Sequence, residues 1–166
     1  MAHVTSSVGW LGAVLAYLAL AIDGRTSTDP QLVRAAYLSM ERVAWLVIVP
    51  CSLGSLVTGL AHSLFAEWGL LKHYWVLTKL VLVLVGTAIL LVHLRTAVDP
   101  MARAVATSGD AALSSHAFGA LPTQLIVHPA GGLLVLLVAT ALSVWKPWGR
   151  TGYGKPERRA ARGATE

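Results

Sequence analysis

The chain has 166 residues, of which 55% are hydrophobic and only 13% are charged, and its formal net charge at pH 7 is +5. Soluble domains carry about 25% charged residues, so this composition excludes a water-soluble enzyme and a disordered chain. The single Cys51 excludes an intramolecular disulfide framework and any Cys-rich zinc or iron–sulfur site. The basic residues lie between apolar stretches and near the C-terminus, which indicates membrane-flanking charge rather than nucleic-acid binding.

Four apolar stretches predict four transmembrane helices, at about residues 4–22, 43–65, 70–94 and 120–145. Each approaches the roughly 20 residues needed to cross about 30 Å of hydrocarbon. Because backbone groups in lipid must satisfy their own hydrogen bonds, these stretches are expected to be helical. The first stretch has no preceding Lys or Arg, so we expect it to stay in the fold rather than be cleaved as a signal peptide.

The predicted fold is therefore all-α, an up-down-up-down four-helix transmembrane bundle over residues 1–146. A basic disordered tail is expected over residues 147–166. Both termini and the second connector would share one side of the bilayer, which carries more Lys and Arg than the other side. The positive-inside rule then predicts a multi-pass protein of the bacterial cytoplasmic membrane with cytoplasmic termini.

Two Asp-Pro pairs mark the connectors. Asp29-Pro30 and Asp99-Pro100 both resemble an N-cap followed by proline at the first helical position. The second helix is therefore expected to begin near Pro30, before the membrane, with its apolar Val33, Tyr37 and Met40 along the interface.

The chain matches itself at an offset of 70 residues, with Arg25–Pro30 aligned to Arg95–Pro100 and His3 aligned to His73. One interpretation is that two helices simply start in the same way after a basic membrane flank. The other is a duplicated helical hairpin, as in parallel transporter repeats, with His3 and His73 facing each other across the bundle.

Lys79 is the most unusual residue of the spans, because it lies about nine residues, or ~14 Å, inside the third stretch. An ionisable group at that depth indicates a functional site by default, although a snorkelling lysine is the alternative. No Asp or Glu occurs within the spans. Lys79 is therefore expected to face the bundle interior, where its partner would be backbone, water, a lipid phosphate or the carboxylate of a ligand, with Trp75 beside it.

Five histidines form two predicted layers, one with His3, His62 and His73 and the other with His93 and His128. An interfacial histidine is commonly only an amphipathic filler, but neutral imidazole is also the commonest transition-metal ligand. Helical bundles build cofactor sites from facing side chains, so all five are candidate metal ligands. Haem b is the expected guest of so apolar a bundle. Copper is the weaker alternative, because all three methionines lie outside the spans.

Two motifs carry a family resemblance. His3, Trp10 and Gly12 form a His-x6-Trp-x-Gly pattern that resembles the first span of the CopD copper-resistance membrane proteins and of the HemJ-type protoporphyrinogen oxidases. Trp75 and Lys79 form a Trp-x3-Lys pattern similar to the third span of both. The resemblance implies a small four-span bacterial member of that superfamily, a bound b-type haem, and a functional pair made of His3 and Lys79.

The leading hypothesis is thus a membrane haem protein that transfers electrons or performs redox chemistry linked to a porphyrin or a quinone. His3 with His73 or His62 would be the axial ligands, Lys79 would be a catalytic or anion-balancing residue, and Trp10 would line the site. Two alternatives remain open: a transporter of copper or another small solute, and a non-catalytic membrane subunit. Besides the lipid bilayer, the expected partners are a second copy of the chain or a redox protein, and whether the chain is an enzyme stays undecided.

Overall fold

The computed structural model describes residues 1–65, 74–110, 113, 118 and 120–145. Within these residues the chain is helical apart from short connectors and contains no strand. Four helices are long and apolar enough to cross a membrane, which confirms the all-α transmembrane fold class. The predicted tail over residues 147–166 and the connector that holds His73 lie outside the described part of the chain.

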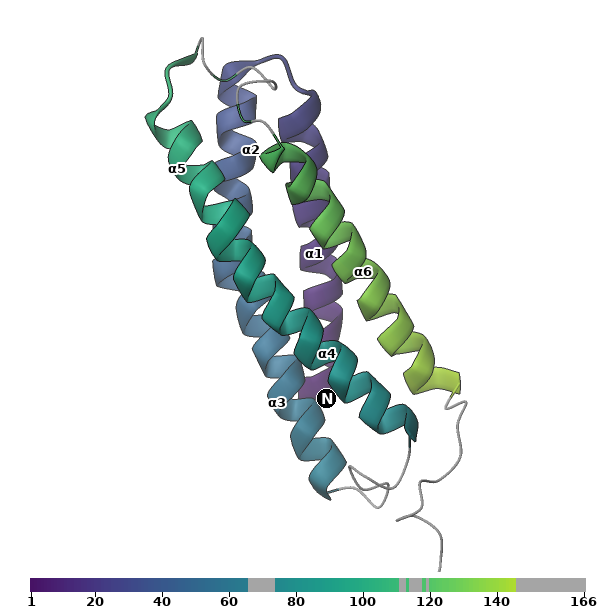
Figure 1. The fold of residues 1–166 in the computed structure, drawn as a ribbon. Helices are drawn as coiled ribbons and strands as arrows, with labels where there is room; N and C mark the ends of the chain where they lie inside the picture. The colour runs from purple at the N-terminus through teal and green to yellow at the C-terminus, as the bar shows by residue number, and fades with distance from the viewer. Residues whose placement is uncertain (66–73, 111–112, 114–117, 119, 146–166) are drawn as a thin grey trace, which may run out of the picture.

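The first and fourth spans are single helices, whereas the second and third spans are longer and each combine three helical segments (Figure 1). The short ones are α1 (Ala2–Thr26) and α6 (Leu121–Trp145). The second span joins α2 (Pro30–Val43), the π-helical segment η1 (Ala44–Ile48) and α3 (Val49–Phe65). The third joins α4 (Tyr74–His93), the π-helical segment η2 (Leu94–Val98) and α5 (Asp99–Thr107).

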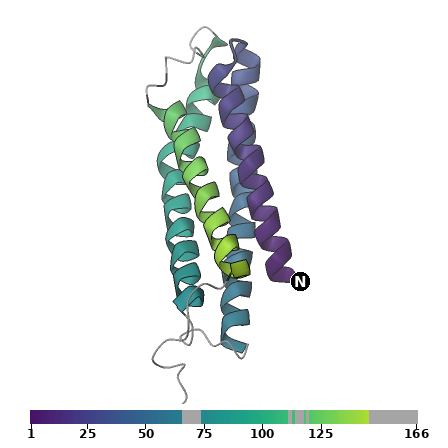
Figure 2. The ribbon, with the colours of Figure 1, turned by 90° about the vertical axis from the view of Figure 1, so that its right-hand side faces the viewer.

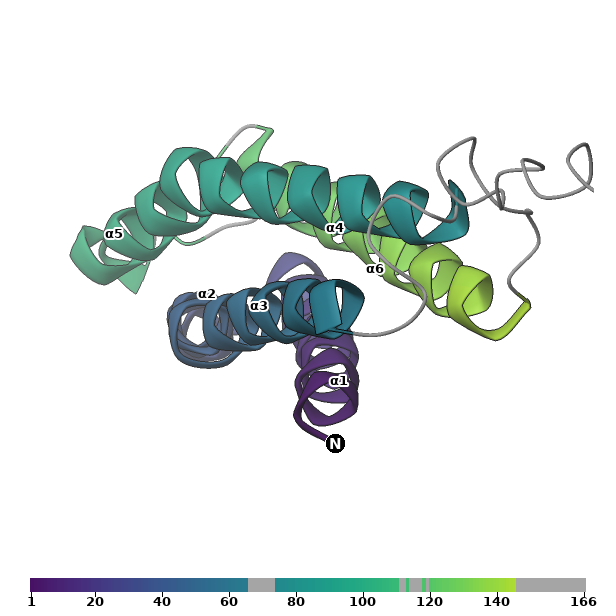
Figure 3. The same cartoon turned by 90° about the horizontal axis from the view of Figure 1, so that it is seen from below.

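The spans follow each other around the bundle, because α1 packs on α3, α3 on α4, α4 on α6 and α6 back on α1. Figure 2 shows the spans side by side. In Figure 3, viewed along the bundle, α4 and α6 lie on one side and α1 and α3 on the other. The start of α1, the end of α3, the start of α4 and the end of α6 lie together at one end, here called the terminal end. The two long spans carry amphipathic extensions, α2 and α5, at the opposite end.

The main core lies between these extensions rather than in the middle of the bundle. Val33, Tyr37 and Met40 of α2 are buried against α1 and α5, with at most 3% of each side chain exposed. The expectation that they lie along the membrane interface is therefore wrong. The sequence showed an apolar stripe on this helix but not that α5, about 70 residues later, would cover it.

The two Asp-Pro pairs play different structural roles. Asp29 is an N-cap, because its carboxylate accepts a hydrogen bond from the backbone N–H of Gln31 at 2.9 Å. The expected second N-cap is wrong, since Asp99-Pro100 lies inside the continuous third span. There the preceding turn is the π-helical η2, whose altered hydrogen-bond register accommodates a proline that has no N–H.

The duplicated hairpin is not supported by the helix boundaries. The connector at residues 27–29 would align with residues 97–99, but those residues belong to η2 and α5 of an unbroken helix. A second copy with the same helix break is therefore absent from this part of the chain. The match of Arg25–Pro30 to Arg95–Pro100 therefore reflects an Asp-Pro dipeptide that starts a helix in one place and lies inside a helix in the other.

Candidate functional site

Two cavities follow one another along α4 and share Val83 in their walls. The one nearer the terminal end has a volume of about 200 Å³ and is lined by His3, His62 and Lys79, so we name it the basic cavity. The other has a volume of about 370 Å³ and walls that are almost entirely apolar, and it contains His93 and His128. We name it the apolar cavity.

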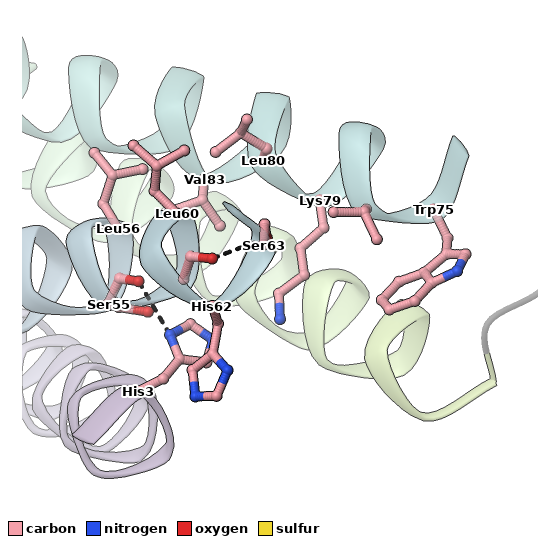
Figure 4. A pocket seen from close by; sticks show the side chains of 12 residues that line it. His3, Ser55, Leu56, Leu60, His62, Ser63, Trp75, Lys79, Leu80 and Val83 are labelled. Carbon is pink, nitrogen blue, oxygen red and sulfur yellow. Dashed lines mark hydrogen bonds between the residues drawn. The ribbon is translucent and has the colours of Figure 1, made fainter. Parts of the chain in front are cut away.

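His3 is held in the basic cavity by α3 (Figure 4). Its Nδ1 lies 3.1 Å from the carbonyl oxygen of Ser55 and 3.2 Å from the hydroxyl of Thr58. A carbonyl only accepts, and the Thr58 hydroxyl already donates to the carbonyl of Gly54, so Nδ1 of His3 is the donor in both contacts. These bonds fix the ring orientation and leave Nε2 available to another group.

Small residues allow α1 to approach α3 closely enough for this arrangement. A Cβ on Gly59 would lie only 3.0 Å from Cε1 of His3, and one on Gly54 would lie 3.1 Å from the Ser6 hydroxyl. The Ser7 and Ser55 hydroxyls share a hydrogen bond of 2.8 Å across the same interface. Gly54 and Gly59 therefore allow close helix packing within the chain.

Lys79 reaches from α4 into the basic cavity, toward His3 and His62 (Figure 4). It lies five residues along the helix, or about 8 Å, from Tyr74 at the described start of α4. The His3 and His62 rings are 6.5 Å apart with an interplanar angle of 59°. Trp75, one turn before Lys79, lines the same cavity.

Within the described residues no hydrogen bond or ion pair involves Lys79, and every described acidic side chain belongs to the other half of the bundle. They are Asp23, Asp29, Glu41, Asp99 and Asp110. Two of them are in ion pairs there, Asp110 with Arg34 at 3.0 Å and Asp99 with Arg95 at 3.5 Å. Asp99 also accepts a hydrogen bond from the Trp45 indole at 3.0 Å.

The apolar cavity contains buried polar atoms without partners. His93 is 6% exposed and Tyr17 is 3% exposed, and both residues line the cavity. In the described part of the chain, Nε2 of His93 and the hydroxyl of Tyr17 have no hydrogen-bond partner. A buried polar atom left unpaired costs about 1–3 kcal/mol, so each unpaired atom marks a position where a ligand could bind.

Glycines line the same cavity without being required by close packing. A Cβ on Gly131 or Gly132 would have no heavy atom within 4 Å, and one on Gly86 would only touch Val135 at 3.8 Å. All three line the apolar cavity. Their missing side chains therefore leave space that another molecule can fill.

The His93 and His128 rings are stacked, with centroids 4.4 Å apart and an interplanar angle of 15°. Nδ1 of His128 donates to the carbonyl of Gln124 at 3.0 Å, which leaves its Nε2 free. Because the two rings stack face to face, no space for a metal ion lies between them. His93 and His128 therefore do not bind one metal ion from opposite sides in this arrangement.

The sequence-predicted site residues thus divide between two places. His3, His62, Trp75 and Lys79 meet at the basic cavity, whereas Trp10, His93 and His128 meet at the apolar one, and His73 lies outside the described residues. Among the residues described, no three His, Cys, Asp or Glu side chains converge as a metal site. Tyr17 and Ser55 were not predicted, because their roles depend on contacts between helices that no local pattern reveals.

A family model described as a predicted integral membrane protein (DUF2269) matches residues 1–147, which include all four spans and both cavities. No curated protein and no solved structure matches the chain. The match supports an integral membrane protein embedded in a lipid bilayer, and it does not extend to the CopD and HemJ-type proteins. The chain belongs to the DUF2269 family of predicted integral membrane proteins.

Proposed function

We propose that this protein binds a haem-type tetrapyrrole in the apolar cavity and acts in electron transfer or in redox chemistry linked to a porphyrin or a quinone. The observation that carries this proposal is the unpaired Nε2 of His93, buried at the wall of a large apolar cavity. Imidazole nitrogen is the commonest protein ligand of haem iron in oxygen-binding and electron-transfer proteins.

The residues of the apolar cavity fit such a group. The volume of about 370 Å³ lies in the range of small-molecule sites, and the glycine wall formed by Gly131 and Gly132 admits a flat ring. His93 would hold the iron, and the stacked His128 ring would restrict the rotation of His93. We place the group here rather than at His3, because α1 and α3 pack closely at Gly59 and leave less room for a macrocycle.

A bound haem would supply one-electron chemistry at its iron. The chain's own residues would bind and shield it. Nε2 of His93 has no hydrogen-bond partner within the described residues, and the aliphatic side chains of α4 and α6 that line the cavity would surround the bound group. Exclusion of water and the apolar surroundings are two of the means by which a protein sets a haem reduction potential.

Copper binding is supported less well. Among the described residues the histidines meet only in pairs, and the pair at the basic cavity lies beside a lysine rather than beside an acidic or sulfur ligand. A cation would therefore be repelled there by Lys79.

The test is the absorption spectrum of the full chain purified in detergent and titrated with haemin. We expect a Soret band shifted from that of free haemin, and we expect the His93→Leu variant to lower haemin affinity by roughly tenfold or more. His62→Leu is the matched control, because it removes a histidine from the other cavity and should leave the spectrum unchanged. A parent protein that stays colourless, or a His93→Leu variant with the parent spectrum, would contradict the proposal.

A further inference from the structure

The basic cavity gathers three basic side chains from three different helices: His3 from α1, His62 from α3 and Lys79 from α4. The Lys79 side chain extends toward the His3 and His62 rings, whose centroids lie 6.5 Å apart (Figure 4). Like charges brought together in a partly desolvated site repel one another, and a bound anion relieves this repulsion. The cluster has the composition of an anion site and not that of a cation site.

No described side chain neutralises this cluster, because the described acidic residues lie toward the α2–α5 end of the bundle. Lys79 can donate three hydrogen bonds and has no hydrogen-bond or ion-pair partner among the described residues. Nδ1 of His3 is committed to Ser55, so a proton on Nε2 would make that nitrogen a second donor toward the cavity. Donors that come from several helices suit the tetrahedral array of phosphate oxygens better than the two coplanar oxygens of a carboxylate.

The rest of the cavity is apolar, which indicates an amphiphilic ligand. Leu56 and Leu60 of α3 and Leu80 of α4 line it beside the basic groups (Figure 4). The site also lies near the terminal end of the bundle, because His3 is the second residue of α1 (Ala2–Thr26). A site at the end of the spans suits an anion at the headgroup level of a bilayer whose hydrocarbon core is about 30 Å thick, with acyl chains able to lie on the leucines.

We propose that the basic cavity is a binding site for the phosphate headgroup of an anionic phospholipid, held by Lys79, His3 and His62. The phosphate interacts with the Lys79 ammonium and the two imidazoles, and the first acyl carbons pack on Leu56, Leu60 and Leu80. This site does not depend on haem, because it uses a different cavity and none of its basic groups is the proposed iron ligand. A haem-free protein should therefore still bind the lipid.

The test is calorimetric titration of the full chain in a neutral detergent with dihexanoyl phosphatidate, and in parallel with inorganic phosphate. We expect the parent to bind the phosphatidate, and Lys79→Met to weaken its affinity by roughly tenfold or more. Lys79→Arg keeps the charge and should retain most of the affinity, which distinguishes loss of the site from loss of the fold. Arg103→Met, which removes one exposed basic residue from α5 at the opposite end, should bind as the parent does.

Each result decides the matter. If Lys79→Met binds the phosphatidate as the parent does, or if Arg103→Met weakens binding equally, the site assignment is overturned. If inorganic phosphate binds as tightly as the amphiphile, the site takes a soluble phosphate compound and the lipid assignment is overturned. Phosphatidate binding that is Lys79-dependent and far tighter than that of free phosphate supports the proposal.

Discussion

Gly59 determines the position of His3, although the two residues are 56 positions apart. Its missing side chain lets the His3 ring lie against the backbone of α3, where Nδ1 donates to the Ser55 carbonyl. Gly12, on α1, has no heavy atom within 4 Å of the position of a Cβ. Comparing alanine variants at Gly59 and Gly12 therefore distinguishes the effect of close packing from the general cost of glycine in a helix.

We predict opposite effects for alanine at these two positions. Gly12→Ala should raise the free energy of unfolding by about 0.5–1 kcal/mol, because alanine loses less backbone entropy in a helix. Gly59→Ala should not raise the free energy of unfolding, because the added Cβ displaces the His3 ring. For the same reason it should weaken phosphatidate binding. Thermal unfolding in detergent and the calorimetric titration measure the two effects, and equal stabilisation by both variants would contradict the proposed packing at Gly59.

At the scale of the helices, one dipeptide serves two purposes. Asp29 begins α2 and caps its first turn, whereas Asp99 lies in the third span, 5% exposed, and accepts a hydrogen bond from Trp45. The Arg95 guanidinium lies 4.9 Å from the centroid of the Trp45 ring and also pairs with Asp99. In one case the carboxylate stabilises a helix end, and in the other it joins the second span to the third.

The cap at Asp29 gives a direct prediction. Asp29→Ala should lower the free energy of unfolding by about 1 kcal/mol, because it leaves the Gln31 N–H without its acceptor. Asp29→Asn is the matched variant and should stay close to the parent, since asparagine caps helices about as well. Thermal unfolding followed by circular dichroism measures both, and an equal loss in the two variants would show that the charge rather than the cap matters.

At the scale of the whole molecule, the packing is uneven along the bundle. The most completely buried large side chains gather where α2, α5 and η2 meet, and Met40, Leu94 and Met101 are each about 1% exposed. The apolar cavity borders this core and the basic cavity lies beyond it, toward the terminal end. Many aliphatic side chains of α4 and α6 face outward, as lipid-facing side chains do. The tightest packing between spans is therefore at the α2–α5 end, and both cavities lie outside it.

The topology predicts which residues share one side of the membrane. In a Cys51→Ala background, cysteines at Ser27 and Gly109 should react with a membrane-impermeant maleimide from the same side, because both follow helix ends at the α2–α5 end. A cysteine at Ala2 should react only from the opposite side, which the positive-inside rule predicts to be the cytoplasm. Labelling of all three positions from one side would contradict the up-down-up-down arrangement.

The sequence by itself determined the membrane fold and its four spans, because hydrophobic length is a local property that a bilayer of fixed thickness selects. It also identified Lys79 and the histidines as the unusual residues, because ionisable groups are rare within spans. It could not give the roles of Asp99, Gly59 or Tyr17, each of which depends on a residue more than 20 positions away.

Only the tertiary structure decided which histidines meet and where the core lies. His3 meets His62 on α3, and His93 meets His128 on α6, through the packing of helices whose periodicity alone leaves their rotation open. The π-helical turn before Pro100 likewise replaced an expected helix start, because contacts of Asp99 with Trp45 and Arg95 stabilise a continuous span there. Helix formation is local, whereas the choice of neighbours is a property of the assembled bundle.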